Sequence, residues 1–180
     1  MRVVGGRTVN ALAANLYSET SQLIIEVVYE HFNRDAADAR FFASNNFAVN
    51  AAGFREACGF DEGFRTSEDR EFCARWRSKG FGMAYEPCAV VRHSHSLTTR
   101  TLWRQHFGYG RGALRFHRSR EAQGEPPFRP DADFYRKLLR AALVRTPKLK
   151  AARLTALLLW SQAANAAGFF YEKLSRNAKP

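Results

Sequence analysis

Cysteine is scarce in this chain of 180 residues, and its scarcity excludes two kinds of small scaffold. The three cysteines, Cys58, Cys73 and Cys88, are odd in number and no two of them form a C-x-x-C pair. Neither a disulfide framework nor a zinc knuckle fits this pattern, and a reducing compartment is the simpler interpretation. The first ten residues also lack the apolar run of a signal peptide, because a Gly-Gly-Arg sequence at 5–7 interrupts it. We therefore expect no export.

Acidic residues are also few, with 17 Asp and Glu against 28 Lys and Arg, a net charge of +11. Such an excess raises the question of nucleic acid, but the chain has neither a zinc-finger motif nor an RNP aromatic pair, so nucleic acid is an unlikely partner. Much of the excess lies beyond His95, in RQHFGYGRGALRFHRSR and RTPKLKAAR. A solvated face, an anionic membrane surface and a diphosphate-bearing substrate all remain open for these runs.

Hydrophobic residues make up 46% of the chain and aromatic residues 13%, enough for one buried core. The apolar spacing predicts a helix from Val9 to Phe32 after a Gly-Gly turn, and alternation predicts a strand over 41–49, FFASNNFAV. A short helix should follow and end at Gly59. The segment TSEDREFCARWRSKG predicts a helix with Thr66 as N-cap and Gly80 as stop. Together these elements indicate an α/β fold.

The second half of the chain should be mostly helical. GMAYEPCAVVRHSH is predicted to be a short or edge strand, because Pro87 cannot join its hydrogen-bond ladder. A basic amphipathic helix should follow, interrupted at Gly108 to Gly112, and then a Pro-rich connector over 119–131 and a helical region over 132–180. We read Asp131 and Asp133 as a helix N-cap rather than as a metal-binding D-x-D pair.

The stretch from Leu154 to Tyr171 contains no charged residue and follows several basic ones. As a helix it would extend roughly 27 Å, just short of the hydrocarbon core of a bilayer. Ser161, Gln162 and Asn165 in its middle favour a helix that lies in the membrane interface or packs on the core over one that spans.

Several polar residues lie at positions where they could take part in catalysis or metal binding. Glu68 and Asp69 open the helix that follows Thr66, where amide dipoles alone would stabilise two acids. Asp69, however, lies on the apolar stripe of that helix, where an unpaired carboxylate is costly to bury; the alternative is therefore a general base that takes a proton from a hydroxyl group. His93 and His95 share one strand face, but an H-x-H pair alone is a weak metal signal and would need a third ligand.

Asn45 and Asn46 lie within a predicted strand, although asparagine is uncommon in strands. A buried asparagine amide must have its hydrogen bonds satisfied. The pair could line an acceptor pocket or cap a bulge, and the residues do not choose between these roles.

Five segments in order resemble the second half of a family 2 glycosyltransferase with the GT-A fold. They are GGRTVNALAANLYSETSQ, FFASNNFAV, GFDEGFRTSEDREFCARW, AYEPCAVVRHSH and LWRQHFGYGRG, and they cover about residues 3 to 115. The resemblance implies a partial GT-A mixed sheet with flanking helices over 1–118, the acceptor-side part of such a domain. A helical region, which is compatible with peripheral membrane contact, would follow the connector.

The resemblance also implies roles for particular residues. Asp69 would be the base with Glu68 beside it, and His93, rather than His95, would help to hold the metal or the donor diphosphate. Asn46, with Asn45 beside it, would lie near the donor sugar and acceptor. The family's G-F-D-E loop corresponds to a stretch that contains Asp61 and Glu62, and its later basic segment corresponds to one that contains Arg104, Gln105 and Arg111.

The chain departs from the family at its beginning, because the nucleotide-binding strand, its turns and the metal-binding D-x-D are absent. The expectation is therefore a fragment that is inactive alone, from an inverting enzyme that transfers a sugar from a nucleotide-diphosphate donor to a hydroxyl acceptor. The acceptor could be lipid-linked or a polysaccharide. A divalent cation, Mn or Mg, is expected only together with the donor half. The expected location is the cytoplasm, including the inner face of the cell membrane.

Overall fold

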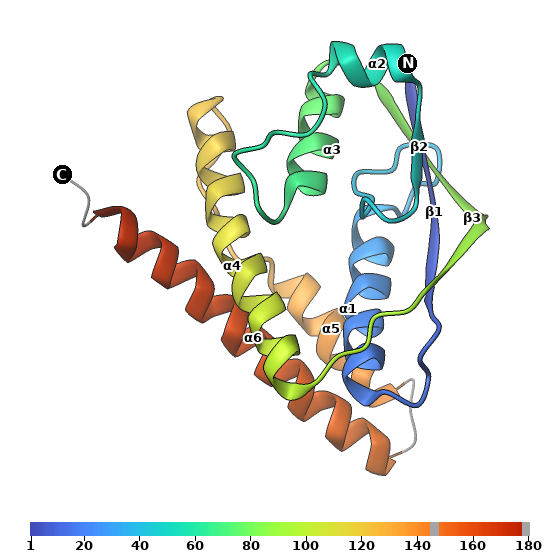
Figure 1. Ribbon diagram of the computed structural model, residues 1–180, viewed down its shortest axis with the longest axis vertical. Coiled ribbons are helices and arrows are strands. Elements are labelled where there is room, and N and C mark those ends of the chain that lie inside the picture. The colour runs from blue at the N-terminus through green and yellow to red at the C-terminus, as the bar shows by residue number, and fades with distance from the viewer. Residues whose placement is uncertain (145–147, 178–180) are drawn as a thin grey trace.

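The computed structural model describes residues 1–144 and 148–177, and in this part the chain is a mixed α/β protein that is mostly helical (Figure 1). Three strands, β1 (Arg2–Asn10), β2 (Phe47–Val49) and β3 (Gly82–His93), form one sheet in the order β2-β1-β3. The central strand β1 pairs antiparallel with β2 and parallel with β3. Six helices accompany the sheet: α1 (Leu16–Phe32), α2 (Ala51–Glu56), α3 (Glu68–Ser78), α4 (Thr99–Ala122), α5 (Ala132–Val144) and α6 (Lys148–Asn177).

The first strand was not expected, because the Gly-Gly pair was interpreted as a turn and Val9 as the start of a helix. Both interpretations are wrong: Val9 lies in β1, and the helix begins at Leu16 after Asn15, whose side chain accepts the Ser18 N–H at 2.9 Å. The two glycines are needed for close packing within the sheet. A Cβ on Gly5 would lie 2.2 Å from the Phe42 ring.

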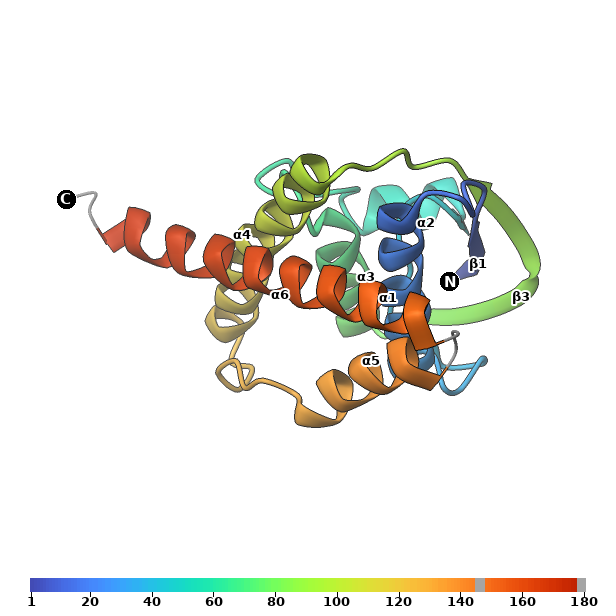
Figure 2. The ribbon, with the colours of Figure 1, turned by 90° about the horizontal axis from the view of Figure 1, so that it is seen from below.

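A bulge separates the two halves of the β1–β3 pairing. Gly6 pairs with Glu86 and the next residue, Arg7, pairs with Val90, so β3 carries three extra residues at 87–89. In Figures 1 and 2, β3 curves away from β1 in this region. Pro87 lies inside the bulge, where its missing N–H costs no ladder hydrogen bond. The edge position predicted for this strand is confirmed, but at 12 residues it is not short.

The predicted strand over 41–49 is mostly a loop, and only Phe47–Val49 is extended. The buried Asn33, which follows α1, explains part of the difference. Its side-chain oxygen accepts the N–H groups of Arg40 and Phe41, and its side-chain nitrogen donates to the Phe41 carbonyl. Backbone groups that a strand would have paired are thus satisfied by a side chain.

Two clusters of buried side chains hold the described part together. The first lies among the sheet, α1 and α3 and contains the fully buried Phe42, Phe72, Trp76 and Met83. The Trp76 indole N–H donates to the Gly82 carbonyl at 3.0 Å and so joins the end of α3 to the start of β3. The second cluster joins α1, α5 and α6 through residues that include Leu23, Val27, Leu138 and Leu158.

The glycines at 108–112 do not interrupt α4, and the prediction of a break is wrong. A Cβ on Gly110 would lie 1.9 Å from the Asn165 carbonyl oxygen, and one on Gly168 would lie 1.9 Å from the Phe107 carbonyl oxygen. The glycines therefore let α4 and α6 approach to backbone contact, and this packing offsets their low helix propensity. Figure 2 shows α6 crossing α4.

The two further helices predicted after the connector are confirmed as α5 and α6. Asp131 caps α5 as expected, since its carboxylate accepts the Phe134 N–H at 3.1 Å. The helix α4 runs past residue 118 to Ala122, while the division of the chain into domains stays a prediction. No helix in the described ranges is long and apolar enough to cross a membrane.

Candidate functional site

The start of α3 places Glu68 and Asp69 beside α4. The N-cap of α3 is Ser67, in the left-handed region at φ 69°, and its side chain makes no capping hydrogen bond. The expectation that Thr66 caps the helix is therefore wrong. The Thr66 hydroxyl instead donates to the Gly108 carbonyl at 2.8 Å, which fixes this turn against α4.

The Asp69 carboxylate is held by backbone groups. It accepts the N–H of Ser44 at 3.4 Å and that of Arg70 at 2.7 Å, and it makes no ion pair with the described residues. Its pKa is raised from 3.8 to about 6, mainly by burial and also by the neighbouring Glu68 carboxylate, which together outweigh the lowering effect of the two amides and of the Arg70 charge. A carboxyl group with such a pKa is ionised near pH 7 and still binds a proton more strongly than an ordinary aspartate.

The first turns of α4 line the same region. The Gln105 side-chain nitrogen donates to the Tyr109 hydroxyl at 2.7 Å. Burial raises the pKa of Tyr109, and the negative charges of Asp69 and Glu68 raise it further, so these carboxylates lie close enough to act on the phenol. Tyr109 keeps 41% of its surface exposed, so the region is open to solvent.

His93 is the last residue of β3 and His95 lies two residues beyond the strand, with the two ring centroids 5.4 Å apart. The expectation that both histidines lie on one strand face is therefore wrong for His95. The pKa of His106 is lowered to about 4, mainly by burial and also by the nearby His95, and the His106 ring lies 5.4 Å from that of Tyr109. Ring contacts join His93 to His95 and, separately, His106 to Tyr109. No hydrogen bond or ring contact joins His93 to Asp69 directly in the described part of the chain.

A metal ion needs several ligands that converge on one point, and in the described part of the chain His93 does not lie in such a group. In the described segments no group of three or more His, Cys, Asp or Glu residues could hold a metal ion. The residues present therefore do not fit a complete metal site, and the role of His93 stays a prediction.

Asn45 and Asn46 have different hydrogen-bond partners. The Asn46 side-chain nitrogen donates to the Arg7 carbonyl at 3.0 Å and to the Ala89 carbonyl at 2.9 Å, across the β1–β3 bulge. The alternative in which an asparagine caps a bulge is thus confirmed for Asn46. Asn45 is exposed and accepts the Thr8 hydroxyl at 3.3 Å, so its contact with substrate stays a prediction.

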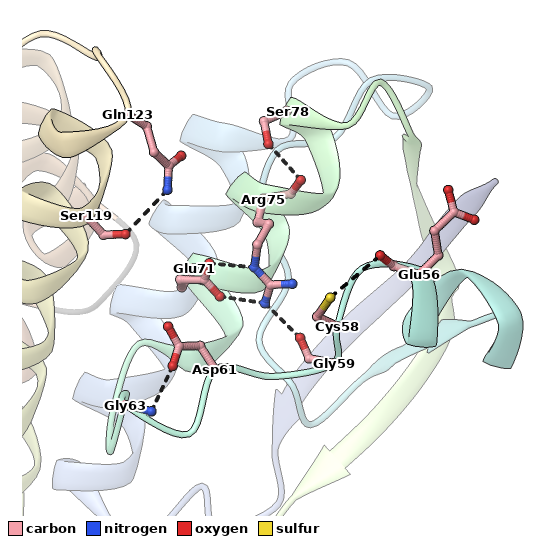
Figure 3. Close-up of polar contacts among 10 residues, drawn as sticks. All are labelled: Glu56, Cys58, Gly59, Asp61, Gly63, Glu71, Arg75, Ser78, Ser119 and Gln123. Atoms are coloured by element: carbon pink, nitrogen blue, oxygen red, sulfur yellow. Dashed lines mark hydrogen bonds and ion pairs between the residues drawn. The ribbon is translucent and has the colours of Figure 1, made fainter.

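The loop that carries Asp61 and Glu62 is braced against α3, as Figure 3 shows. The Arg75 guanidinium binds both carboxylate oxygens of Glu71, at 2.7 and 2.8 Å, and donates to the Gly59 carbonyl at 2.7 Å. The Asp61 carboxylate accepts the N–H of a glycine two residues later at 2.8 Å. Asp61 and Glu62 are exposed, so this loop presents two acids to solvent.

The basic residues predicted on α4 differ in their surroundings. Arg104 is exposed. Arg111 pairs at 2.8 Å with Glu172 of α6, a carboxylate only 3% exposed, which Arg115 also binds at 2.9 Å. Arg111 thus has a structural partner, and its contact with a diphosphate stays a prediction.

One member of the site was not predicted: Ser44 donates its backbone N–H to Asp69 from a turn that the strand prediction concealed. Tyr109 lies within the basic segment that the sequence indicated, but the effect of Asp69 and Glu68 on its pKa was not expected. The spacing of Gln105 and Tyr109, four residues apart on a helix, was the available signal, because such residues share a face.

Comparison with known proteins gives one partial match. The chain is 39% identical over 70 residues to the O-antigen chain rhamnosyltransferase RfbN of Salmonella typhimurium. The matched stretch is 38% of this chain and 22% of RfbN, so the chain spans about a fifth of the length of that relative. No family profile matches the chain, and no solved structure matches it. The similarity supports an origin related to glycosyltransferases.

Proposed function

We propose that this chain is the acceptor-side part of a family 2 glycosyltransferase with a GT-A fold, and that Asp69 is its general base. Two observations made separately support the proposal: the order of five sequence segments, and the partial similarity to a rhamnosyltransferase. The raised pKa of Asp69 and the backbone amides that bind its carboxylate support its role as the base.

In an inverting transfer, Asp69 would accept the proton of an acceptor hydroxyl group. The acceptor oxygen would form a bond to the anomeric carbon of the donor sugar, and the bond from that carbon to the nucleoside diphosphate would break, its electron pair leaving with the diphosphate. A base with a pKa of about 6 suits this step, because it is mostly ionised at pH 7 yet holds the proton better than an ordinary aspartate.

The other residues would support the base and position the substrates. Glu68 keeps the Asp69 pKa high, and the backbone amides of Ser44 and Arg70 orient the carboxylate. Asn45 and the exposed acids Asp61 and Glu62 would bind sugar hydroxyl groups. The exposed Arg104, with Gln105 and Arg111 on the same helix, would approach the donor diphosphate.

The donor would be a nucleotide sugar, and a rhamnosyl donor is the first candidate because the matched relative is a rhamnosyltransferase. The acceptor would be a hydroxyl group on a lipid-linked or polysaccharide glycan. We place this activity in the cytoplasm or at the inner face of the cell membrane. Any divalent cation, Mn or Mg, would need ligands beyond those described here, so no step is assigned to it.

The test compares Asp69→Asn with wild type, using the chain alone and the chain fused to any polypeptide that the reading frame upstream encodes. Sugar transfer from a panel of nucleotide sugars is measured, with donor affinity measured by calorimetry. We expect Asp69→Asn to lower kcat about 100-fold or more with little change in donor Kd, the range expected for loss of a general base. Asp35→Asn, at an exposed aspartate in the loop after α1, is the matched control. Unchanged turnover in Asp69→Asn would reject the assignment.

A further inference from the structure

The outward side of α6 is unusually apolar for an exposed helix. Its inner side is a regular buried stripe that includes Leu154, Leu158 and Ala164. The outer side exposes large apolar residues, with exposed fractions from 43% to 74%: Leu149, Leu159, Trp160, Phe170 and Leu174. We call these five residues the outer apolar face.

The polar residues in the middle of α6 do not interrupt this face. Ser161 is buried and its hydroxyl donates to the Leu158 carbonyl at 2.7 Å, while Gln162 donates to the Ser161 hydroxyl at 3.3 Å. Asn165 is half-buried at the crossing with Gly110. Of these three residues, which argued against a spanning helix, one is buried and two are half-buried, so none lies fully on the exposed side. The outer apolar face therefore has no charged residue from Leu154 to Tyr171.

The neighbouring helix α5, which packs against α6, adds a second exposed stripe. Tyr135, Leu139 and Leu143 are spaced four residues apart and are 42%, 41% and 60% exposed. Helix positions four apart share one face. Figure 1 shows α6 along the outer edge of the molecule, with α4 and α5 on its inner side.

The charges around these stripes are almost all positive. Residues 132–180 contain ten Lys and Arg against two Asp and Glu, a net charge of +8, which is most of the excess of the whole chain. Both acids are already engaged. Glu172 is buried between Arg111 and Arg115, and Asp133 pairs with basic side chains that include Lys137 at 2.6 Å. Lys148 and Arg153 at one end of the outer apolar face, and Lys173 near the other, are exposed.

We propose that the outer apolar face of α6 docks into the interface of an anionic lipid membrane, with the helix lying in the membrane plane. Apolar and aromatic side chains would enter the headgroup boundary, and the flanking lysines and arginines would attract anionic headgroups. A second copy of the chain fits less well, because a symmetric contact would bring two strongly positive surfaces together. The proposal does not depend on Asp69 and stands or falls separately from the transfer reaction.

Vesicle flotation tests the proposal with the intact chain. Two vesicle preparations are compared, phosphatidylcholine alone and phosphatidylcholine mixed with phosphatidylglycerol, at low and physiological salt. We expect binding to the anionic vesicles, weakened by salt. We expect the double variant Leu159→Glu with Phe170→Glu to bind at least about tenfold more weakly, since each substitution removes an apolar anchor and adds a repelled charge. Val90→Glu makes the same kind of change at an exposed valine on β3 and should bind like wild type.

A second measurement follows the wild-type chain alone. Trp160 is 43% exposed on the outer apolar face, so brominated lipid should quench its fluorescence in anionic vesicles. Absence of binding to anionic vesicles, or equal binding by the double variant, would overturn the proposal. Dimerisation by light scattering that the double variant abolishes, without vesicle binding, would assign the face to a second copy instead.

Discussion

Replacing Asp69 by asparagine should make the protein more stable above pH 6 while it removes activity. The carboxylate is half-buried beside Glu68, and its pKa is raised from 3.8 to about 6. Ionisation is therefore harder in the folded state than in the unfolded chain. Asparagine has nearly the same shape, and its single side-chain oxygen can still accept the Arg70 N–H, which lies 2.7 Å from one carboxylate oxygen. The Ser44 N–H binds the other oxygen at 3.4 Å and would lose its acceptor, because the asparagine NH2 group only donates. The substitution should remove the electrostatic cost, keep the shorter hydrogen bond and lose the longer, weaker one.

The sign and size follow from proton linkage. Below pH 3.8 the carboxyl group is protonated in both states and imposes no cost. As the pH rises to about 6 the unfolded chain loses its proton first, so the stability of the folded wild type falls, and above pH 6 the loss is complete. The shift corresponds to about 3 kcal/mol at most. Because the carboxylate keeps some contact with water and asparagine loses the weak bond from Ser44, we expect a gain of about 1–2 kcal/mol in Asp69→Asn at pH 8, or about 2–5 °C in Tm.

Urea denaturation followed by circular dichroism at pH 4 and pH 8 measures this effect. The difference in unfolding free energy between Asp69→Asn and wild type should be large at pH 8 and should shrink toward pH 4. Asp35→Asn, at an exposed position, should show no such stabilisation. Equal differences at the two pH values, or a less stable Asp69→Asn at pH 8, would refute the reasoning that this carboxylate is held ionised at a cost.

Two further predictions concern packing and thiol chemistry. Gly110→Ala should destabilise the protein by about 1–3 kcal/mol in chemical denaturation, because the new Cβ would meet the backbone of α6. Gly108→Ala in the same helix, where the nearest atom to the new Cβ is 3.4 Å away, should be neutral or slightly stabilising. Equal effects of the two substitutions would disprove the close crossing of α4 and α6. Burial raises the pKa of the Cys73 thiol to about 12, so this thiol should react with Ellman's reagent at pH 8 only after unfolding. The two exposed cysteines should react at once. Rapid reaction of all three thiols in the folded protein would contradict the buried position of Cys73.

Local signals in the sequence were sufficient for several elements. The helix α3 ends before Gly80, which adopts φ +78° as a helix stop requires, and Asp131 caps α5. These features depend on residues close together in the chain, because caps and stops satisfy backbone groups within a few positions. The importance of the region around Glu68 and Asp69 was also visible, since an acid on an apolar stripe conflicts with burial.

Glycine and asparagine were harder to interpret because their roles depend on distant partners. The Gly-Gly pair was read as a turn and the glycines of α4 as a break, but Phe42 and Asn165, far away in the sequence, are what make glycine necessary. In the same way, Asn46 bridges the carbonyl groups of two different strands across a bulge. Local propensity contains no information about such approaches.

By itself the sequence determined the helical second half, the excess of positive charge and the set of polar residues available for chemistry. Tertiary structure alone decided which of these residues meet. It buried the Asp69 carboxylate and brought the Ser44 N–H to it, and so set the pKa of that carboxyl group. It also buried Ser161 of α6 beside Leu154 and Leu158 and left the outer apolar face of that helix exposed. The physical reason is that burial and electrostatic interaction depend on distance in space, which the order of residues along the chain does not specify.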